Sequence, residues 1–169
     1  MERKMIVLVE DTKDKANYGF MAFATPDFYA KKAELMMNVT SESFEIMNRE
    51  HQVVEVISLE NLSQVTISLC SRIVSSSGFG GGLRTTVHID CDFEMKDGTV
   101  YAYECVRPDT FEIVFDKLNQ HNISINDPIN VQKVYRDMEA AGQRNKYLSG
   151  NFGKLARKFK LDHPRRNKK

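Results

Sequence analysis

The sequence has no tryptophan, only three cysteines, four prolines and nine glycines among its 169 residues. The low cysteine, proline and glycine contents exclude a disulfide-dense mini-protein and a collagen-like repeat. The longest early apolar run, Met5 to Val9, is too short for a membrane-spanning helix or the core of a signal peptide. With 41 % hydrophobic and 28 % charged residues, we expect a soluble, cytoplasmic protein without a transmembrane segment, forming one domain with a small appendage.

Motifs that carry known chemistry are also missing. There is no nucleophile elbow, no pair of catalytic carboxylates and no dinucleotide fingerprint. The glycine-rich stretch 75–82 lacks the Gly-Lys-Ser/Thr ending of a phosphate-binding loop and is typical of a flexible hairpin loop. Cys70, Cys91 and Cys105 form no Cys-x-x-Cys pair, so we expect buried thiols in a reducing compartment. The sequence therefore predicts no enzyme, no cofactor and no metal.

Charge is distributed unevenly along the chain. Residues 1–132 contain 12 Lys+Arg and 20 Asp+Glu, a balance of −8, whereas residues 133–169 contain 12 and 3, a balance of +9. A basic end on an acidic body indicates either a surface for an acidic partner or helices that compensate the charge of the body.

Several short segments have the composition of β-strands. These are the runs 35–39, 43–48, 52–57, 64–74 and 83–95, with a further short strand predicted over 5–10. In the run 83–95, strict alternation predicts a core face made by Val87, Ile89, Cys91, Phe93 and Met95. The other face carries His88, Asp90, Asp92 and Glu94. We interpret it as a solvated outer face, because one strand cannot supply a closed metal shell.

Asp97-Gly98 between two such runs is the strongest hairpin signal in the chain. A two-residue turn would direct Ala102 and Val106 inward, together with Glu104. A three-residue loop would instead direct Tyr101, Tyr103 and Cys105 to the core, so the register stays open at this point.

The last third of the sequence has helical periodicity. Phe111, Val114, Phe115 and Leu118 form an apolar stripe that predicts a helix ending near His121. Asp127-Pro128 predicts the start of a second helix that reaches Gly142. We expect a third helix to begin near Ser149 or Asn151, followed by a basic tail over 164–169.

This order of elements resembles the bacterial pleckstrin-homology-like (PH-like) domains. The resemblance is carried by the segments 44–48, 56–65 and 97–103 and by the helix over 110–121. It implies an α+β fold in which an antiparallel curved sheet or small partly open barrel is capped by a C-terminal helix. Such a domain would span residues 33–125, between an unassigned segment 1–32 and a helical basic extension 126–169.

The resemblance also implies a scaffold that binds peptides, proteins or lipid head groups. The first hairpin loop, Thr40 to Ser43, has no basic residue, so we do not expect phosphoinositide binding through it. We predict a non-enzymatic interaction module that binds a protein or peptide through the barrel edge or the groove beside the closing helix, with Phe79 as a loop contact.

A nucleic-acid-binding protein is the alternative function. Basic residues of the C-terminal extension would contact phosphates, and Tyr147 would add stacking. The segment between the last two expected helices is longer than the 3–4 residues of a helix-turn-helix. The candidate contact residues are Lys146, Lys154, Arg157, Lys158, Lys160, Arg165 and Arg166.

Overall fold

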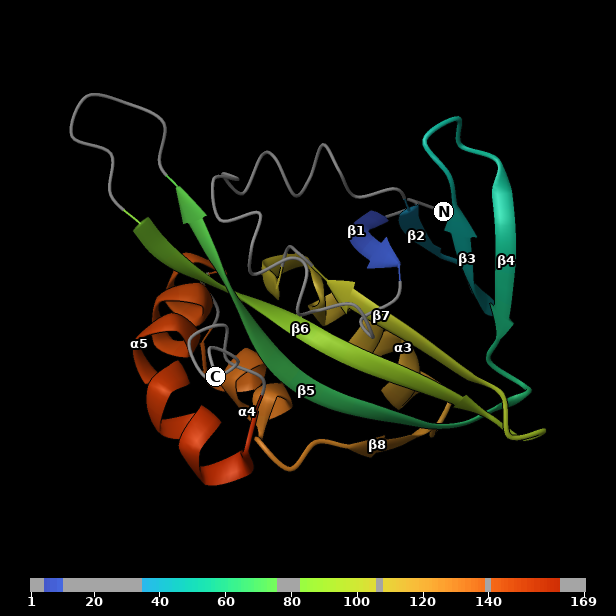
Figure 1. Ribbon diagram of the computed structural model, residues 1–169. Helices are drawn as coiled ribbons and strands as arrows, with labels where there is room; N and C mark the ends of the chain where they lie inside the picture. The colour runs from blue at the N-terminus through green and yellow to red at the C-terminus, as the bar shows by residue number, and fades with distance from the viewer. Residues whose placement is uncertain (1–4, 11–34, 76–82, 106–107, 139–140, 162–169) are drawn as a thin grey trace.

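The computed structural model describes residues 5–10, 35–75, 83–105, 108–138 and 141–161 (Figure 1). These residues form an α+β fold of strands followed by helices, which agrees with the predicted class. The strands are β1 (Met5–Glu10), β2 (Leu35–Val39), β3 (Ser43–Met47), β4 (Val53–Ser58), β5 (Leu62–Ser75), β6 (Leu83–Met95), β7 (Val100–Cys105) and β8 (Ser124–Asn126). The helices are the 3-10 turn η2 (Pro108–Thr110), α3 (Glu112–Gln120), α4 (Val131–Asp137) and α5 (Ala141–Phe159).

The strands belong to one sheet with the order β4-β3-β2-β1-β7-β6-β5-β8. All neighbours are antiparallel except β5 and β8, which run parallel. The early strand β1 lies between β2 and β7, so the N-terminal segment 1–32 contributes a strand to the middle of the sheet.

The sheet bends back on itself. Strands β4 and β5 stand far apart in the strand order, yet only residues 59–61 connect them along the chain. Figure 1 shows that β2, β3 and β4 run in a direction that crosses the direction of the long hairpin of β5 and β6. The order ends at β4 and β8, so the described strands form an open, curved sheet and not a closed barrel.

The hairpin between β6 and β7 has the three-residue loop. Met95 N–H donates to Thr99 O at 2.8 Å, and Gly98 adopts φ +88°, a left-handed conformation that glycine tolerates best. Thr99 N–H donates to Asp97 Oδ1 at 2.8 Å, and this backbone hydrogen bond lowers the pKa of Asp97. In this register Tyr103 and Cys105 are buried, which resolves the two alternatives left by the sequence.

The hydrophobic core lies on the face of the sheet that the helices cover. Phe93 on β6 contacts Phe44 on β3, with ring centroids 5.4 Å apart, and Tyr103 on β7 at 6.1 Å. The side chains of Phe111, which immediately precedes α3, and of Val114, Phe115 and Leu118 on α3 are all buried, as their helical spacing predicts. All three cysteines are buried as well.

The last two helices have different bounds from those predicted. Helix α4 ends at Asp137, and α5 runs without interruption through Gly150 and Gly153, so the expected helix start near Ser149 or Asn151 is wrong. Helix α5 is held over its whole length because Arg144, Leu148, Phe152 and Ala156 form one buried stripe at helical spacing.

Because α5 already begins at Ala141, only residues 138–140 lie between α4 and α5. The expectation that this segment is too long for a helix-turn-helix is therefore wrong. No helix in the described part of the chain is long and apolar enough to cross a membrane.

Candidate functional site

Strand β4 carries exposed apolar side chains along an edge of the sheet. Val53, Val54 and Val56 are 49 %, 53 % and 50 % exposed. Ile57, the next residue along β4, is fully buried in the core. In the described sheet β4 has one neighbour, β3, on one side only. Edge strands in natural proteins commonly carry lysine, proline or a bulge that discourages further pairing. Here Glu55 is the one charged residue of β4. The bulge is on β4 itself, where Val54 is the extra residue between Glu55 and Val53, while Glu55 to Ser58 pair with β3 in regular register.

Backbone groups of β4 also point away from the sheet. Leu59 N–H donates to Glu42 O at 2.9 Å, which sets the alternation of hydrogen-bonded pairs along β3 and β4. By this alternation the N–H groups of Val56 and Ser58 face outward. Val56 N–H indeed takes the Glu55 carboxylate as a local acceptor at 3.2 Å instead of a β3 carbonyl. The edge of β4 therefore offers donors, acceptors and apolar side chains to an added strand.

The groove beside the closing helix, which was the second predicted binding route, is present but polar. A hollow of about 310 Å³ lies between α3 and α4. Glu112, Asp116 and Arg136 line it together with Phe115. A second hollow of about 340 Å³ lies against α4 and α5 and includes Val134 and Leu155. Neither combines apolar surface with open backbone groups as β4 does.

The predicted basic contacts that the structure describes lie on one exposed face of α5 or at its end. At 100° per residue, Lys146, Lys154, Arg157 and Lys158 fall within about 120° of one another around the helix. Residues 141–161 contain no Asp or Glu. Tyr147 on the same face is 43 % exposed. Lys160, just beyond α5, is also exposed, whereas Phe79, Arg165 and Arg166 lie outside the described residues.

The polar face of β6 was predicted to be solvated over its whole length, but its His88 end is buried. Asp92 is exposed, and Asp90 and Glu94 are half-buried, which suits an outer face. His88, however, is only 2 % exposed, so its placement on a solvated face is wrong. Polar side chains from two neighbouring strands lie beside it, and a pattern read along one strand does not contain them.

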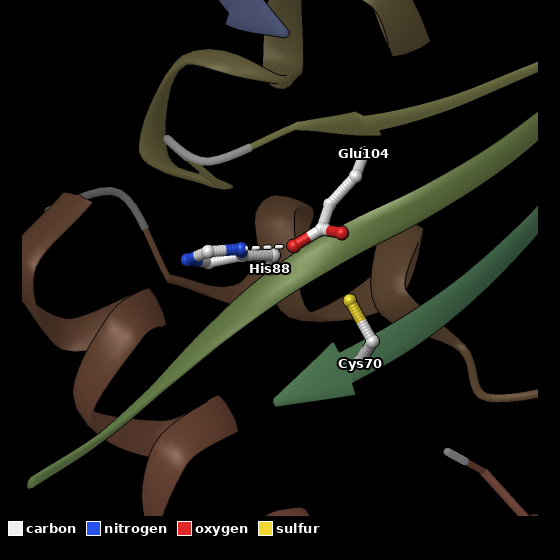
Figure 2. A group of neighbouring side chains, drawn as sticks. All are labelled: Cys70, His88 and Glu104. Carbon is white, nitrogen blue, oxygen red and sulfur yellow. Dashed lines mark hydrogen bonds and ion pairs between the residues drawn. The ribbon is translucent and has the colours of Figure 1, made fainter. Parts of the chain in front are cut away.

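Cys70, His88 and Glu104 form that cluster. Cys70 on β5 lies directly opposite His88 on β6, and Glu104 on β7 lies opposite Asp90, two residues further along β6. His88 Nδ1 contacts Glu104 Oε1 in a short hydrogen bond, and Thr86 Oγ1 lies 3.4 Å from the other ring nitrogen, Nε2. Figure 2 shows the three side chains converging from their three strands, with Nδ1 on the ring edge nearest the carboxylate.

Sequence reasoning missed Glu104 and Cys70 as partners of His88. The three-residue hairpin register carried the missing signal, because directing Tyr103 and Cys105 to the core turns Glu104 to the His88 face. These candidate sites are known from their geometry alone. No protein-family model and no curated protein matches this chain.

Proposed function

We propose that this chain is a non-enzymatic interaction module that takes up an extended segment of another protein as an added strand along β4. One observation carries the proposal: β4 combines outward backbone groups with the half-exposed side chains of Val54 and Val56. Main-chain hydrogen bonds would supply affinity, and contacts to alternate side chains would supply selectivity. The strand order and the closing helix α3 favour a partly open barrel of the PH-like kind as the scaffold.

The chemistry of the hairpin indicates the partner segment. Residues 40–58, which form β3, β4 and their turns, contain four glutamates and one arginine. Val54 and Val56 lie on either side of Glu55, and both side chains are about half exposed, at 53 % and 50 %. A complementary segment would alternate β-branched apolar residues with polar or basic ones. This composition suits both the valine side chains and the local negative charge.

We expect the substitution Val56→Lys to weaken such binding by about tenfold or more, because a charge replaces an apolar contact at the centre of the edge. Peptides selected from a random display library by the full chain would serve as probes, with affinity measured by calorimetry. Val100→Lys is the matched control, since Val100 is 54 % exposed on β7. It should leave the affinity unchanged.

Three results would overturn the proposal. The library could yield no peptide, the selected peptides could tolerate Val56→Lys, or both lysine variants could lose binding equally. Sedimentation of the full chain adds a further check. A dimer that dissociates on Val56→Lys would identify a second copy of this chain as the occupant of β4, and the proposed foreign segment would then be wrong.

The basic face of α5 supports nucleic-acid binding as a second candidate function. Because each phosphate contact releases condensed counterions, affinity for a duplex should fall steeply with salt. We expect the double substitution Arg157→Glu with Lys158→Glu to abolish this affinity and flatten its salt dependence. The substitution pair Lys133→Glu with Arg136→Glu on α4 makes the same charge change on other exposed residues. Equal losses in both variants, or no binding at low salt by the unaltered chain, would exclude this candidate.

A further inference from the structure

The cluster of Cys70, His88 and Glu104 unites three side chains that all bind metal ions. A ring nitrogen of His88, Cys70 Sγ and a carboxylate oxygen of Glu104 lie within 4.8 Å of one another. Their exposed fractions are 2 % for His88 and Glu104 and 0 % for Cys70. The pairing of His88 with Glu104 offsets the cost of burying these two groups, and the buried Cys70 thiol beside them completes a set of three ligand-type side chains.

We propose that Cys70, His88 and Glu104 bind a divalent transition-metal ion of borderline softness, zinc being the best fit. Thiolate, imidazole and carboxylate together match the ligands of protein zinc sites. Calcium and magnesium take oxygen ligands and would not use the thiolate. A thiolate and a carboxylate carry two negative charges, which a dication cancels in this buried setting.

The spacing of the ligand atoms requires only side-chain movement. From ordinary zinc bond lengths, ligand atoms in a tetrahedral site lie about 3.3–3.8 Å apart. The sulfur is within 4.8 Å of the other two atoms, and the contact between His88 Nδ1 and Glu104 has to open by a small rotation of either side chain. Binding would displace the thiol proton to solvent, and bonds from the ion to the ring nitrogen and the carboxylate would replace the hydrogen bond between them. The three residues would leave the fourth coordination position of a tetrahedral ion open to another ligand.

The backbone supports this arrangement. The three side chains project from three adjacent, paired strands, β5, β6 and β7, and the paired backbones fix the spacing between them. Ligands on a rigid sheet need little reorganisation on binding. The same position of His88 argues against a cysteine nucleophile activated by histidine, because Nδ1 is engaged by Glu104 and Nε2 lies beside Thr86.

Cobalt and zinc provide a direct test on the full chain. Protein produced in medium supplemented with either metal should contain about one ion per chain, as a single three-ligand site requires. The cobalt form should show a thiolate-to-cobalt charge-transfer band in the near ultraviolet. Chelator treatment should lower the melting temperature of the zinc form, because the ion binds only the folded chain.

Variants assign the site to its residues. Cys70→Ser should remove the charge-transfer band and lower the metal content about tenfold or more, by analogy with the losses seen when metal sites are disturbed. Cys91→Ser is the matched control. Cys91 is a buried thiol on β6 whose Sγ donates to Tyr103 O at 3.3 Å on the opposite face, so its replacement should preserve the metal and the band.

The unaltered chain alone can overturn the proposal, even if Cys70→Ser fails to fold. Protein that acquires neither metal contradicts it, and so does cobalt bound without a thiolate band. A metal content that falls equally in Cys91→Ser also contradicts it. The outcome for the β4 edge is independent, since neither Val54 nor Val56 belongs to this cluster.

Discussion

Replacing Phe93 with alanine is expected to lower the free energy of unfolding by about 3–5 kcal/mol, the usual cost of emptying a buried aromatic site. Phe93 is fully buried and contacts Phe44 at 5.4 Å and Tyr103 at 6.1 Å between ring centroids. It therefore joins strand β3, from one part of the curved sheet, to β6 and β7 from the other. Its loss should loosen the bend that holds β4 at the edge.

Denaturant titration would measure this effect. Phe93→Leu keeps most of the apolar volume and should cost clearly less than alanine. Val100→Ala, at a position 54 % exposed, should change stability by less than about 0.5 kcal/mol, as surface substitutions usually do. If Phe93→Ala proved as mild as Val100→Ala, the two parts of the sheet would not share the core described above.

Removing the Arg144 side chain by Arg144→Ala is expected to cost about 2–4 kcal/mol, through lost charge-assisted hydrogen bonds and orphaned carbonyls. Arg144 is 4 % exposed and forms a bidentate ion pair with Glu112 on α3, at 2.6 and 3.0 Å. It also donates to Met138 O at 2.5 Å and Tyr135 O at 3.1 Å, which caps the end of α4. Its guanidinium lies 4.8 Å from the Tyr135 ring centroid.

The result should be a specific loosening of α5. Amide hydrogen exchange of α5 should accelerate more than that of β5 and β6, because Arg144 fastens α5 to α3 and α4. Arg144→Lys retains the charge but not the planar fork, so it should recover only part of the stability. Full stability in Arg144→Lys would mean that charge alone is needed, and uniform acceleration in Arg144→Ala would refute the local role.

Local patterns predicted the parts of the fold that depend on one element and its nearest neighbour. The alternation from Val87 to Phe93 correctly predicted the buried face of β6, and the stripe of Val114, Phe115 and Leu118 predicted α3. The Asp97-Gly98 signal located the hairpin. In β6 and α3 the apolar residues recur with the period of the strand or helix, so that they all face the core.

Features that depend on distant strands were beyond such patterns. Cys70 and Glu104, the neighbours of the buried His88, are 18 and 16 residues away along the chain and meet it only through strand pairing. The place of β1 between β2 and β7 likewise follows from long-range pairing. The sequence predicted one helix that reaches Gly142 and another that begins near Ser149 or Asn151, and so missed the continuous α5. Gly150 and Gly153 weaken helical propensity, whereas burial of Leu148 and Phe152 stabilises the helix across both glycines.

The sequence led to the expectation of binding at an edge or groove but did not indicate which strand would form the edge. The resemblance to PH-like domains implied binding at an edge or groove, yet β4 was one of several short β-prone runs in the sequence. Only the strand order shows that β4 ends the sheet, and only there do its valines become half-exposed side chains on an open backbone. The same composition in a central strand would indicate burial and nothing more.

Residue-resolved amide hydrogen exchange, with and without a selected peptide, tests the uptake of a strand at β4 most directly. Strand addition would engage the outward N–H groups of Val56 and Ser58, so their exchange should slow on binding by about a hundredfold, as new buried hydrogen bonds imply. The amide of Val100 should be unaffected. Peptide binding that leaves the Val56 and Ser58 amides exchanging at their unbound rates would contradict the account.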